Sequence, residues 1–257
     1  MPDSPHPFPF LIRIMKSNTD HPVIVSSETW LAARRELLKE EKEFSRVRDR
    51  LSARRRALPW AKVETKYVFD SVDGPASLAD LFVGRSQLIV YHFMLAPGWE
   101  EGCRGCSFVC DHVDGALAHL NARDVSFAAV SRAPLEEIER FKARMGWRFP
   151  WVSSHGTSFN RDFGVSFTEQ EVQAGHGEYN FSQREIGGEE MPGLSVFTRG
   201  EPDNVFRTYS TYSRGLDLLI GTYNFLDLVP SGRAEDPEAP MSWVRHHDRY
   251  EPAAIAG

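Results

Sequence analysis

The chain has 257 residues, a length that fits one large domain or one domain with added segments. Its 30 basic and 36 acidic residues give a formal net charge of −6, and 41% of the residues are hydrophobic. This composition can form a hydrophobic core, argues against global disorder, and lacks the basic excess of general nucleic-acid binders. Three cysteines cannot hold together a disulfide-built secreted domain of this size, so we expect a soluble, cytoplasmic protein with no nucleic-acid partner.

No stretch approaches the ~20 consecutive apolar residues that a membrane span requires, so we expect no membrane partner. The apolar run from Phe8 to Met15 contains Pro9 and Arg13 and is followed by no small-residue cleavage site, unlike a signal peptide. We therefore expect residues 1–22 to form a flexible tail. A further hypothesis is that translation starts at Met15.

A long helix is expected from Ser26 to about Arg56, because no Gly or Pro interrupts the chain before Pro59. Apolar residues recur on it every seven positions, at Trp30, Leu37, Phe44, Leu51 and Leu58. Its charged faces could grip an anionic partner, or they could be solvated while the apolar stripe packs on the main domain or on another subunit. We favour the second interpretation, with residues 23–58 as a helical arm on the main domain and a homodimer as one possible assembly.

Residues 59–230 show strands and helices in alternation. The run from Gln87 to Met94 is apolar on both faces and predicts a central buried strand. A helical pattern then extends to about Ala122, a second strand is expected from Val125 to Ser131, and Pro134 opens a helix that extends to about Met145. This order predicts parallel strands joined by right-handed crossovers.

The following segment, residues 153–190, has no clean period and is expected to be a long loop insertion of the kind that often binds ligands. A hairpin is expected from residues 194–198 and 205–209, and a last helix over about residues 216–226. Residues 231–257 are rich in Pro, Asp, Glu and Arg, which predicts a flexible or surface-draped tail.

A Cys-x-x-Cys pair directly after the buried strand carries the strongest chemical signal. At the start of a helix, backbone N–H groups and the positive end of the dipole favour a thiolate at Cys103, and Arg104 adds to this. Cys106 falls three residues later on the apolar face, so we predict Cys103 as the exposed nucleophile and Cys106 as the shielded resolving thiol. Glu100 and Glu101 are expected to oppose thiolate formation. Trp99 could cover the disulfide and contact substrate, or it could be an ordinary loop anchor.

The strand, the dithiol and the later hairpin together resemble the thioredoxin-like superfamily. That resemblance implies that Met191 and Pro192 bind substrate beside the dithiol, with Pro192 in a cis peptide bond that leaves the preceding backbone free to pair. More closely, the chain resembles a bacterial thioredoxin-like family catalogued as domain of unknown function 899. The resemblance covers about residues 22–232 and rests on stretches such as RALPW at 56–60, QLIVYHFM at 87–94, GCRGCSF at 102–108 and YSTYSRG at 209–215.

The resemblance implies an α/β thioredoxin-like fold with an N-terminal helical extension and a long loop insertion. It also implies a redox site, which predicts a thiol–disulfide oxidoreductase that acts on a protein or small-molecule disulfide and needs no cofactor or metal. It identifies no substrate.

Three other interpretations stay open. A peroxidase is disfavoured because Glu101 and Arg104 stand where the peroxiredoxin motif that begins at Pro97 has Thr and Cys. A copper or zinc site could use Cys106 and Cys110 with a distant histidine, for which the candidates are His155 and His176. The fold could also serve as a non-catalytic binding module. Three single residues have both a structural and a chemical interpretation: Cys110 as a core residue or second resolving thiol, and His92 and His112 as structural residues or bases.

Overall fold

The computed structural model describes residues 23–201 and 204–251. The tail predicted over residues 1–22 lies outside the described residues, as does the end of the predicted C-terminal tail. The chain divides into two compact units, Met1–Arg55 and Arg56–Gly257, which are described separately.

The first unit contains the predicted long helix, α1 (Ser27–Arg56). Ser26 caps it, because its hydroxyl accepts a hydrogen bond from the N–H of Thr29 at 3.2 Å. Ion pairs along the helix, such as Lys39 with Glu36 at 2.6 Å, add a few tenths of a kcal/mol each. Side chains of the seven-residue stripe are exposed, Trp30 by 59% and Phe44 by 67%. The packing of this arm on the main domain stays a prediction.

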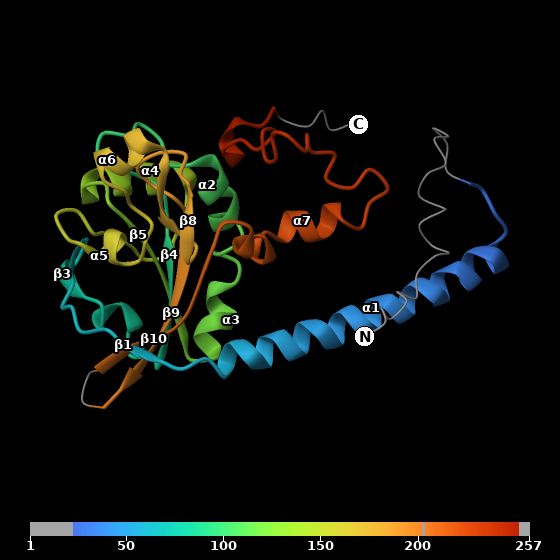
Figure 1. Ribbon diagram of the computed structural model, residues 1–257, viewed down its shortest axis with the longest axis horizontal. Helices are drawn as coiled ribbons and strands as arrows, with labels where there is room; N and C mark the ends of the chain where they lie inside the picture. The colour runs from blue at the N-terminus through green and yellow to red at the C-terminus, as the bar shows by residue number, and fades with distance from the viewer. Residues whose placement is uncertain (1–22, 202–203, 252–257) are drawn as a thin grey trace, which may run out of the picture. The chain divides into compact units, whose positions relative to one another are not determined.

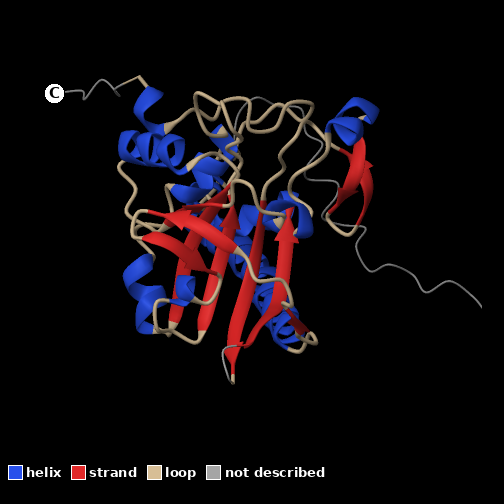
Figure 2. Cartoon of the chain, turned by 90° about the vertical axis from the view of Figure 1, so that its left-hand side faces the viewer, coloured by secondary structure: helices blue, strands red, loops and turns tan. Residues whose placement is uncertain are grey.

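The second unit is built on a mixed β-sheet, whose strands are drawn in red in Figure 2. At its centre, β4 pairs with β5 in parallel, which is the predicted parallel crossover, and with β9 in antiparallel fashion. The predicted hairpin is formed by β9 and β10. In the described part of the chain the strand order is β1 (Ala61–Lys62), β10 (Asn204–Tyr212), β9 (Gly193–Gly200), β4 (Gln87–His92), β5 (Val125–Ser131), β6 (Trp151–Ser153), β2 (Val68–Ser71) and β3 (Gly74–Ser77).

Two hydrophobic cores cover the two faces of this sheet. Side chains alternate along β4, so Tyr91 lies in one core and Val90 in the other, as expected for a strand buried on both sides. The first core packs against α2 (Arg104–Cys110), α3 (Leu117–Ala122), α4 (Leu135–Met145) and α7 (Gly221–Leu226). The second packs against the 3₁₀ helix η1 (Asp80–Phe82) and α5 (Phe159–Asp162). The helices therefore bury both faces of the sheet, as the parallel crossover connections of β4, β5 and β6 require (Figure 1).

The helix predicted from the cysteines to Ala122 is interrupted, and this expectation was wrong in detail. Turns separate α2 from α3 over residues 111–116. The Asp114 carboxylate accepts hydrogen bonds from the backbone N–H groups of Arg148 and Phe149, at 3.0 to 3.2 Å. These bonds tie the interruption to the connection between α4 and β6. The predicted C-terminal helix is similarly divided into a 3₁₀ helix, η2 (Ser213–Leu219), and α7.

The long insertion predicted over residues 153–190 has short regular elements of its own. After α5 come α6 (Glu169–Ala174), which begins with a capping box between Thr168 and Glu171, and the hairpin of β7 (His176–Tyr179) and β8 (Ser182–Glu185). A small core holds this segment to the end of β10, through Val165, Phe167, Tyr179, Ile186 and Tyr212. The chain thus has the predicted α/β thioredoxin-like fold with an N-terminal helix and a long insertion.

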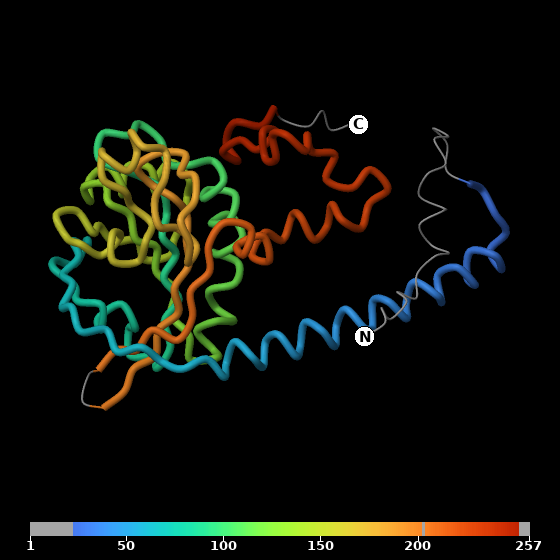
Figure 3. The backbone as a smooth tube through the Cα atoms, viewed as in Figure 1, coloured from blue at the N-terminus to red at the C-terminus, as the bar shows by residue number. Residues whose placement is uncertain are grey.

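The segment after α7 folds back onto α2, as Figure 3 shows for the red end of the chain. Val244 and His246 are 1% and 2% exposed. The Nε2 atom of His246 lies 2.9 Å from the carbonyl oxygen of Gly102, and Trp243 packs edge-on against Phe108. Residues in the predicted tail region are therefore part of the first core.

We predict that Gly102→Ala destabilises the protein. A Cβ atom at this position would lie 2.5 Å from Phe93 and 2.7 Å from Phe141, two buried rings that cannot move away freely. Overpacking of this kind costs about 1–3 kcal/mol of unfolding free energy, measurable by urea denaturation. Gly115→Ala is the matched control, because its Cβ would meet nothing within 4 Å. Equal stabilities for the two variants would contradict the packing described for this loop.

Candidate functional site

The Cys-x-x-Cys pair lies where the chain leaves β4 and enters α2. Cys103 is the residue immediately before α2, and its N–H donates to the carbonyl oxygen of Met94 at 3.1 Å. Its own carbonyl oxygen accepts a hydrogen bond from the hydroxyl of Ser107 at 2.9 Å. The backbone is therefore fixed on both sides of the first thiol, which stays partly exposed.

The environment of Cys103 favours its thiolate. The thiol of Cys106 donates a hydrogen bond to the Cys103 sulfur, the backbone N–H groups of Cys106 and Gly105 donate two more, and the Arg104 charge adds a smaller attraction. Partial burial acts in the opposite direction. The hydrogen bonds outweigh it and lower the pKa of Cys103 to about 6.

Cys106 has the opposite character. It is 1% exposed, and burial raises the pKa of its thiol well above the ordinary value. The Tyr91 hydroxyl forms a hydrogen bond with its side chain, and the N–H of Met94 lies 3.5 Å from its sulfur. The two thiols are free in this structure. The pair therefore combines an accessible sulfur that ionises easily with a buried sulfur that holds its proton.

The carboxylate of Glu101 is paired away from the thiol. Arg144 binds it at 2.8 Å, Arg249 forms a second ion pair with it, and the Nδ1 atom of His246 lies 3.6 Å away. The sequence suggested that this negative charge opposes a Cys103 thiolate. In the structure its charge is balanced by arginines from α4 and from the C-terminal segment, so that opposition is offset.

A cleft of about 320 Å³ opens beside the two cysteines. Tyr91, Cys103, Cys106 and Pro192 are among the residues that line it. The rest of the lining comes from α2, from the segment of η2 and α7 and from the C-terminal segment: Gly105, Val109, Ser213, Arg214, Leu216, Asp217, Ile220, Tyr223, Arg233, Glu235, Pro240 and Met241. A cavity of this size beside a reactive thiol suits a small molecule.

Pro192 lines the cleft, but the other two predicted substrate-binding residues, Met191 and Trp99, do not. Met191 packs against the small core of the insertion. Trp99 packs against the first core and donates a hydrogen bond from its ring nitrogen to Glu189 at 3.1 Å. Glu189 in turn pairs with Arg132, so Trp99 acts as an anchor between the loop after β4 and the insertion.

The expected cis bond before Pro192 was wrong, because the described residues contain no cis peptide bond. Contacts from the insertion hold the backbone here. The N–H of Met191 donates to the carbonyl oxygen of Val165 at 2.8 Å, and the carbonyl oxygen of Pro192 accepts from the Tyr179 hydroxyl at 2.6 Å. Generic thioredoxin-like sequence patterns carry no information about such contacts from an inserted segment.

The histidines considered as bases have structural partners. His92 lies on the opposite face of the sheet from the thiols, within 5.5 Å of the Phe159 and Phe163 rings, and its Nε2 atom bonds to Ser195 at 2.9 Å. Burial lowers the pKa of His92 to about 3, so it is neutral. His112 bridges the Phe108 carbonyl and the Thr222 hydroxyl.

The residues proposed for a copper or zinc site do not form one cluster. Cys110 is completely buried in the first core, and burial raises the pKa of its thiol. His155 and His176 instead lie within hydrogen-bond distance of backbone carbonyl groups, those of Arg132 and Ala174. Within residues 23–201 and 204–251, no group of three or more His, Cys, Asp and Glu side chains is placed to hold a metal ion.

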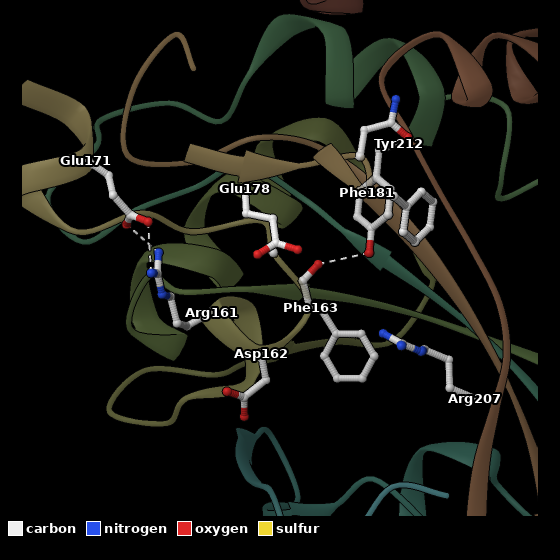
Figure 4. A pocket seen from close by; sticks show the side chains of 10 residues that line it. Arg161, Asp162, Phe163, Glu171, Glu178, Phe181, Arg207 and Tyr212 are labelled. Atoms are coloured by element: carbon white, nitrogen blue, oxygen red, sulfur yellow. Dashed lines mark hydrogen bonds and ion pairs between the residues drawn. The ribbon is translucent and has the colours of Figure 1, made fainter. Parts of the chain in front are cut away.

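A second cavity, of about 450 Å³, lies between the insertion and β10 and contains no cysteine (Figure 4). Arg161 and Glu171 form an ion pair on one side of it, and the Tyr212 hydroxyl donates to the Phe163 carbonyl at 2.9 Å on the other. The Arg207 guanidinium lies over the Phe163 ring at 5.5 Å. The contacts of Tyr212 and Arg207 with Phe163 join the insertion to β10, the second strand of the β9–β10 hairpin.

Sequence reasoning missed several residues of the cysteine cleft. The sequence places Tyr91 in a buried strand. A pattern that is apolar on both faces does not indicate which side chain of that strand contacts a thiol. Arg233, Glu235 and Met241 fall in the region that composition assigned to a tail. The pattern Met-x-Trp-Val at 241–244 was the available signal, because three apolar residues within a polar tail indicate a docked segment.

We predict that iodoacetamide alkylates Cys103 with a pH profile centred near pH 6. The rate should fall as the pH drops through this value, because protonation removes the thiolate. In Cys106→Ala the midpoint should move up, since the strongest hydrogen bond to the thiolate is lost. Cys110→Ala, which removes the third thiol, should leave it in place. A native midpoint near the free-cysteine value of about 8.5 would contradict the geometry.

Comparison with known proteins identifies the family and finds solved structures that are similar to part of the chain. The chain resembles a peroxiredoxin Q mutant from Xanthomonas campestris, with 15% identity over 62% of this chain and 90% of that one and a TM-score of 0.40. It also resembles the peroxidoxin BcpB of Mycobacterium tuberculosis (14% identity, 64% and 95% coverage, TM-score 0.43) and a hypothetical protein of Sinorhizobium meliloti 1021 (12%, 70% and 77%, 0.40).

No curated protein sequence is significantly similar to the chain. Among the helices of the described residues, none is both long and apolar enough to cross a membrane. The family described as "Bacterial protein of unknown function (DUF899)" matches residues 19–250, which includes the thiol pair, the insertion and most of the docked C-terminal segment. This chain therefore belongs to the DUF899 family.

Proposed function

We propose that the protein is a thiol–disulfide oxidoreductase whose nucleophile is Cys103 and whose resolving thiol is Cys106. The observation that carries this proposal is the asymmetry of the pair. Cys103 is partly exposed and its pKa is lowered to about 6, whereas Cys106 is buried, protonated and in hydrogen-bond contact with it. Near neutral pH, most copies of the protein then have an ionised Cys103 beside the cleft and a protonated Cys106 that can attack in the second step.

The reaction follows from this arrangement in two exchanges. The Cys103 thiolate attacks one sulfur of a disulfide, the S–S bond breaks, and the first leaving group departs as a thiolate, which then takes a proton from water. The mixed disulfide removes the negative charge from the Cys103 sulfur. Cys106 then loses its proton to water and attacks that sulfur, which releases the second leaving group as a thiolate, and that thiolate takes up a proton to become the second thiol. Two electrons pass to the substrate, and a Cys103–Cys106 disulfide remains. A dithiol or two monothiols, by the reverse exchange, restore the reduced pair.

Tyr91 is a positioning residue for the second exchange. Its hydroxyl bonds to the side chain of Cys106 and lowers the pKa of that buried thiol, against the larger effect of burial. The hydroxyl is fixed by β4 and lies in the first core, so it needs no rearrangement when Cys106 becomes charged. A donor already in place stabilises the thiolate that forms as Cys106 attacks.

We predict that Cys106→Ser accumulates a mixed disulfide on Cys103 after reaction with bis(2-hydroxyethyl) disulfide, because the resolving thiol is gone. Intact-mass measurement should show one bound 2-mercaptoethanol group, removable by dithiothreitol. Cys103→Ser should stay unmodified, because the remaining thiols are buried. Cys110→Ser should behave like the wild type and form the internal disulfide. Modification of Cys103→Ser at the wild-type rate would overturn the assignment of the nucleophile.

A further prediction concerns Tyr91→Phe. Loss of one hydrogen bond to the forming thiolate should slow release of the second thiol by about tenfold at neutral pH. The pH midpoint of that step should rise, while the rate of the first exchange stays near the wild-type value. Tyr67→Phe removes the hydrogen bond from Tyr67 to Asp162, away from the thiols, and should change neither step. An unchanged pH profile in Tyr91→Phe would remove Tyr91 from the mechanism.

A further inference from the structure

The backbone beside Pro192 is already paired within the chain. The N–H of Met191 donates to Val165, and the N–H of Phe167 donates to Glu189, at 2.8 and 3.0 Å. These two bonds flank an antiparallel bridge between Ser166 and Glu190. Residues 165–167, near the start of the insertion, therefore lie along residues 189–191, where the insertion ends, as a short added strand.

This pairing occupies backbone groups beside Pro192 that a polypeptide could otherwise pair with by strand addition. A peptide that binds by strand addition uses free N–H and C=O groups at an exposed edge. Here the N–H of Met191 is occupied, Pro192 has no N–H, and its carbonyl oxygen accepts the Tyr179 hydroxyl at 2.6 Å. A substrate strand could bind there only by displacing residues 165–167 and the core that holds them.

Side chains reinforce the added strand. Glu190 is 2% exposed and bonds to the Arg132 guanidinium at 2.6 Å and to the Ser166 hydroxyl at 2.8 Å. Burial raises the pKa of Glu190, and these bonds oppose that effect. A buried carboxylate with its partners just after β5 and on residues 165–167 is costly to separate, so the edge is closed stably rather than transiently.

The C-terminal segment confines the other side of the thiol pair. Met241 lies so close to α2 that a Cβ atom on Gly105 would be 3.3 Å from its terminal methyl group. The Glu235 carboxylate holds this segment in place, because one of its oxygens accepts from the Tyr223 hydroxyl, the Trp243 ring and the N–H of Met241. What remains open beside Cys103 is the cleft of about 320 Å³.

The walls of this cleft are chiefly apolar, and its charges are internally paired. Arg214 bonds to Asp217 at 3.0 Å, and Arg233 binds Asp227 through two hydrogen bonds of 2.7 Å. The Arg233 guanidinium also stacks on the Tyr223 ring at 3.9 Å. A ligand in the cleft would therefore contact apolar surface and charged side chains that are already paired with each other, which suits a compact molecule without a large net charge.

We propose that the substrate is a low-molecular-weight disulfide that enters this cleft, and that disulfides of folded or extended polypeptides are excluded. This inference rests on the proposed function and narrows it to one substrate class. The exchange is the one written above: the small disulfide gains two electrons and two protons and leaves as two thiols, and the Cys103–Cys106 pair is oxidised. A low-molecular-weight dithiol supplies the electrons for the next turnover.

The test compares two substrates with the full-length protein and dithiothreitol as the dithiol, after subtraction of the uncatalysed rate. Bis(2-hydroxyethyl) disulfide is the small probe, and insulin is the polypeptide probe. We expect kcat/KM per disulfide to be about 100-fold higher for the small probe, a difference that corresponds to the loss of two or three hydrogen bonds of strand addition. Comparable values for the two probes would overturn the substrate class.

A variant locates the binding site. Gly105→Leu places a side chain in the cleft against a flexible methionine and keeps the backbone N–H that bonds to the thiolate. It should lower kcat/KM for the small disulfide at least about tenfold, mainly through KM. Formation of the methyl mixed disulfide of Cys103 with the smaller reagent methyl methanethiosulfonate, which releases methanesulfinate, should change much less. Gly115→Leu, at an open position, is the control. Equal kinetics of Gly105→Leu and wild type would place the substrate elsewhere.

Hydrogen exchange tests the closed edge without turnover. The amides of Met191 and Phe167 should exchange slowly in the native protein, because both are donors within the added strand. Fast exchange at both would mean that the edge is open and would contradict the exclusion of peptides.

If the protein forms no Cys103–Cys106 disulfide with any oxidant, the proposed function itself fails. If it reduces insulin as readily as the small probe, only the substrate class fails.

Discussion

The chemistry of this protein depends on the three hydrogen bonds that the Cys103 sulfur accepts, from the Cys106 thiol and from two backbone N–H groups of α2. They require the chain to leave β4, pass over the Phe93 and Phe141 rings at Gly102, and enter the helix at the correct angle. The pairing of Glu101 with Arg144 and Arg249 keeps an unbalanced negative charge away from the sulfur. Each of these contacts supports the same result, a thiolate near neutral pH.

Two segments outside the core of the fold modify the surroundings of this sulfur. Within the insertion, residues 165–167 pair with residues 189–191 and occupy the backbone beside Pro192. The C-terminal segment places Met241 and Glu235 along the cleft and is fixed by the buried His246. Together they turn an open dithiol surface into a bounded cavity. The proposed specificity therefore comes from segments that the general fold does not require.

Much of the fold could be predicted from the sequence, because the strongest patterns come from local physics. The run from Leu88 to Tyr91 is apolar on both faces of β4, as its sequence pattern indicates. Pro134 stands directly before α4, as the helix-start rules indicate. The position of Cys103 before a helix followed from its place after that strand. These features depend on neighbours close in sequence, so short-range rules suffice.

Contacts between distant segments could not be predicted in the same way. The division of the helix after Cys110 depends on Asp114 and two N–H groups more than thirty residues away. The trans bond at Pro192 accompanies hydrogen bonds from Val165 and Tyr179, and the docked tail depends on His246 meeting a carbonyl at Gly102. The effect of the Glu101 charge on Cys103 could not be predicted from sequence distance either. Glu101 is close to the thiols in the sequence, but in the structure it is paired with arginines.

The most direct measurement is a redox equilibrium of the full-length protein in mixtures of reduced and oxidised glutathione, quenched by acid, alkylated after unfolding and mapped by peptide mass. The account predicts one reversible two-electron transition in which Cys103 and Cys106 disappear together from the alkylated fraction while Cys110 remains alkylated. A pair that stays fully alkylated under the most oxidising mixture, or a disulfide that includes Cys110 in place of Cys106, would contradict it.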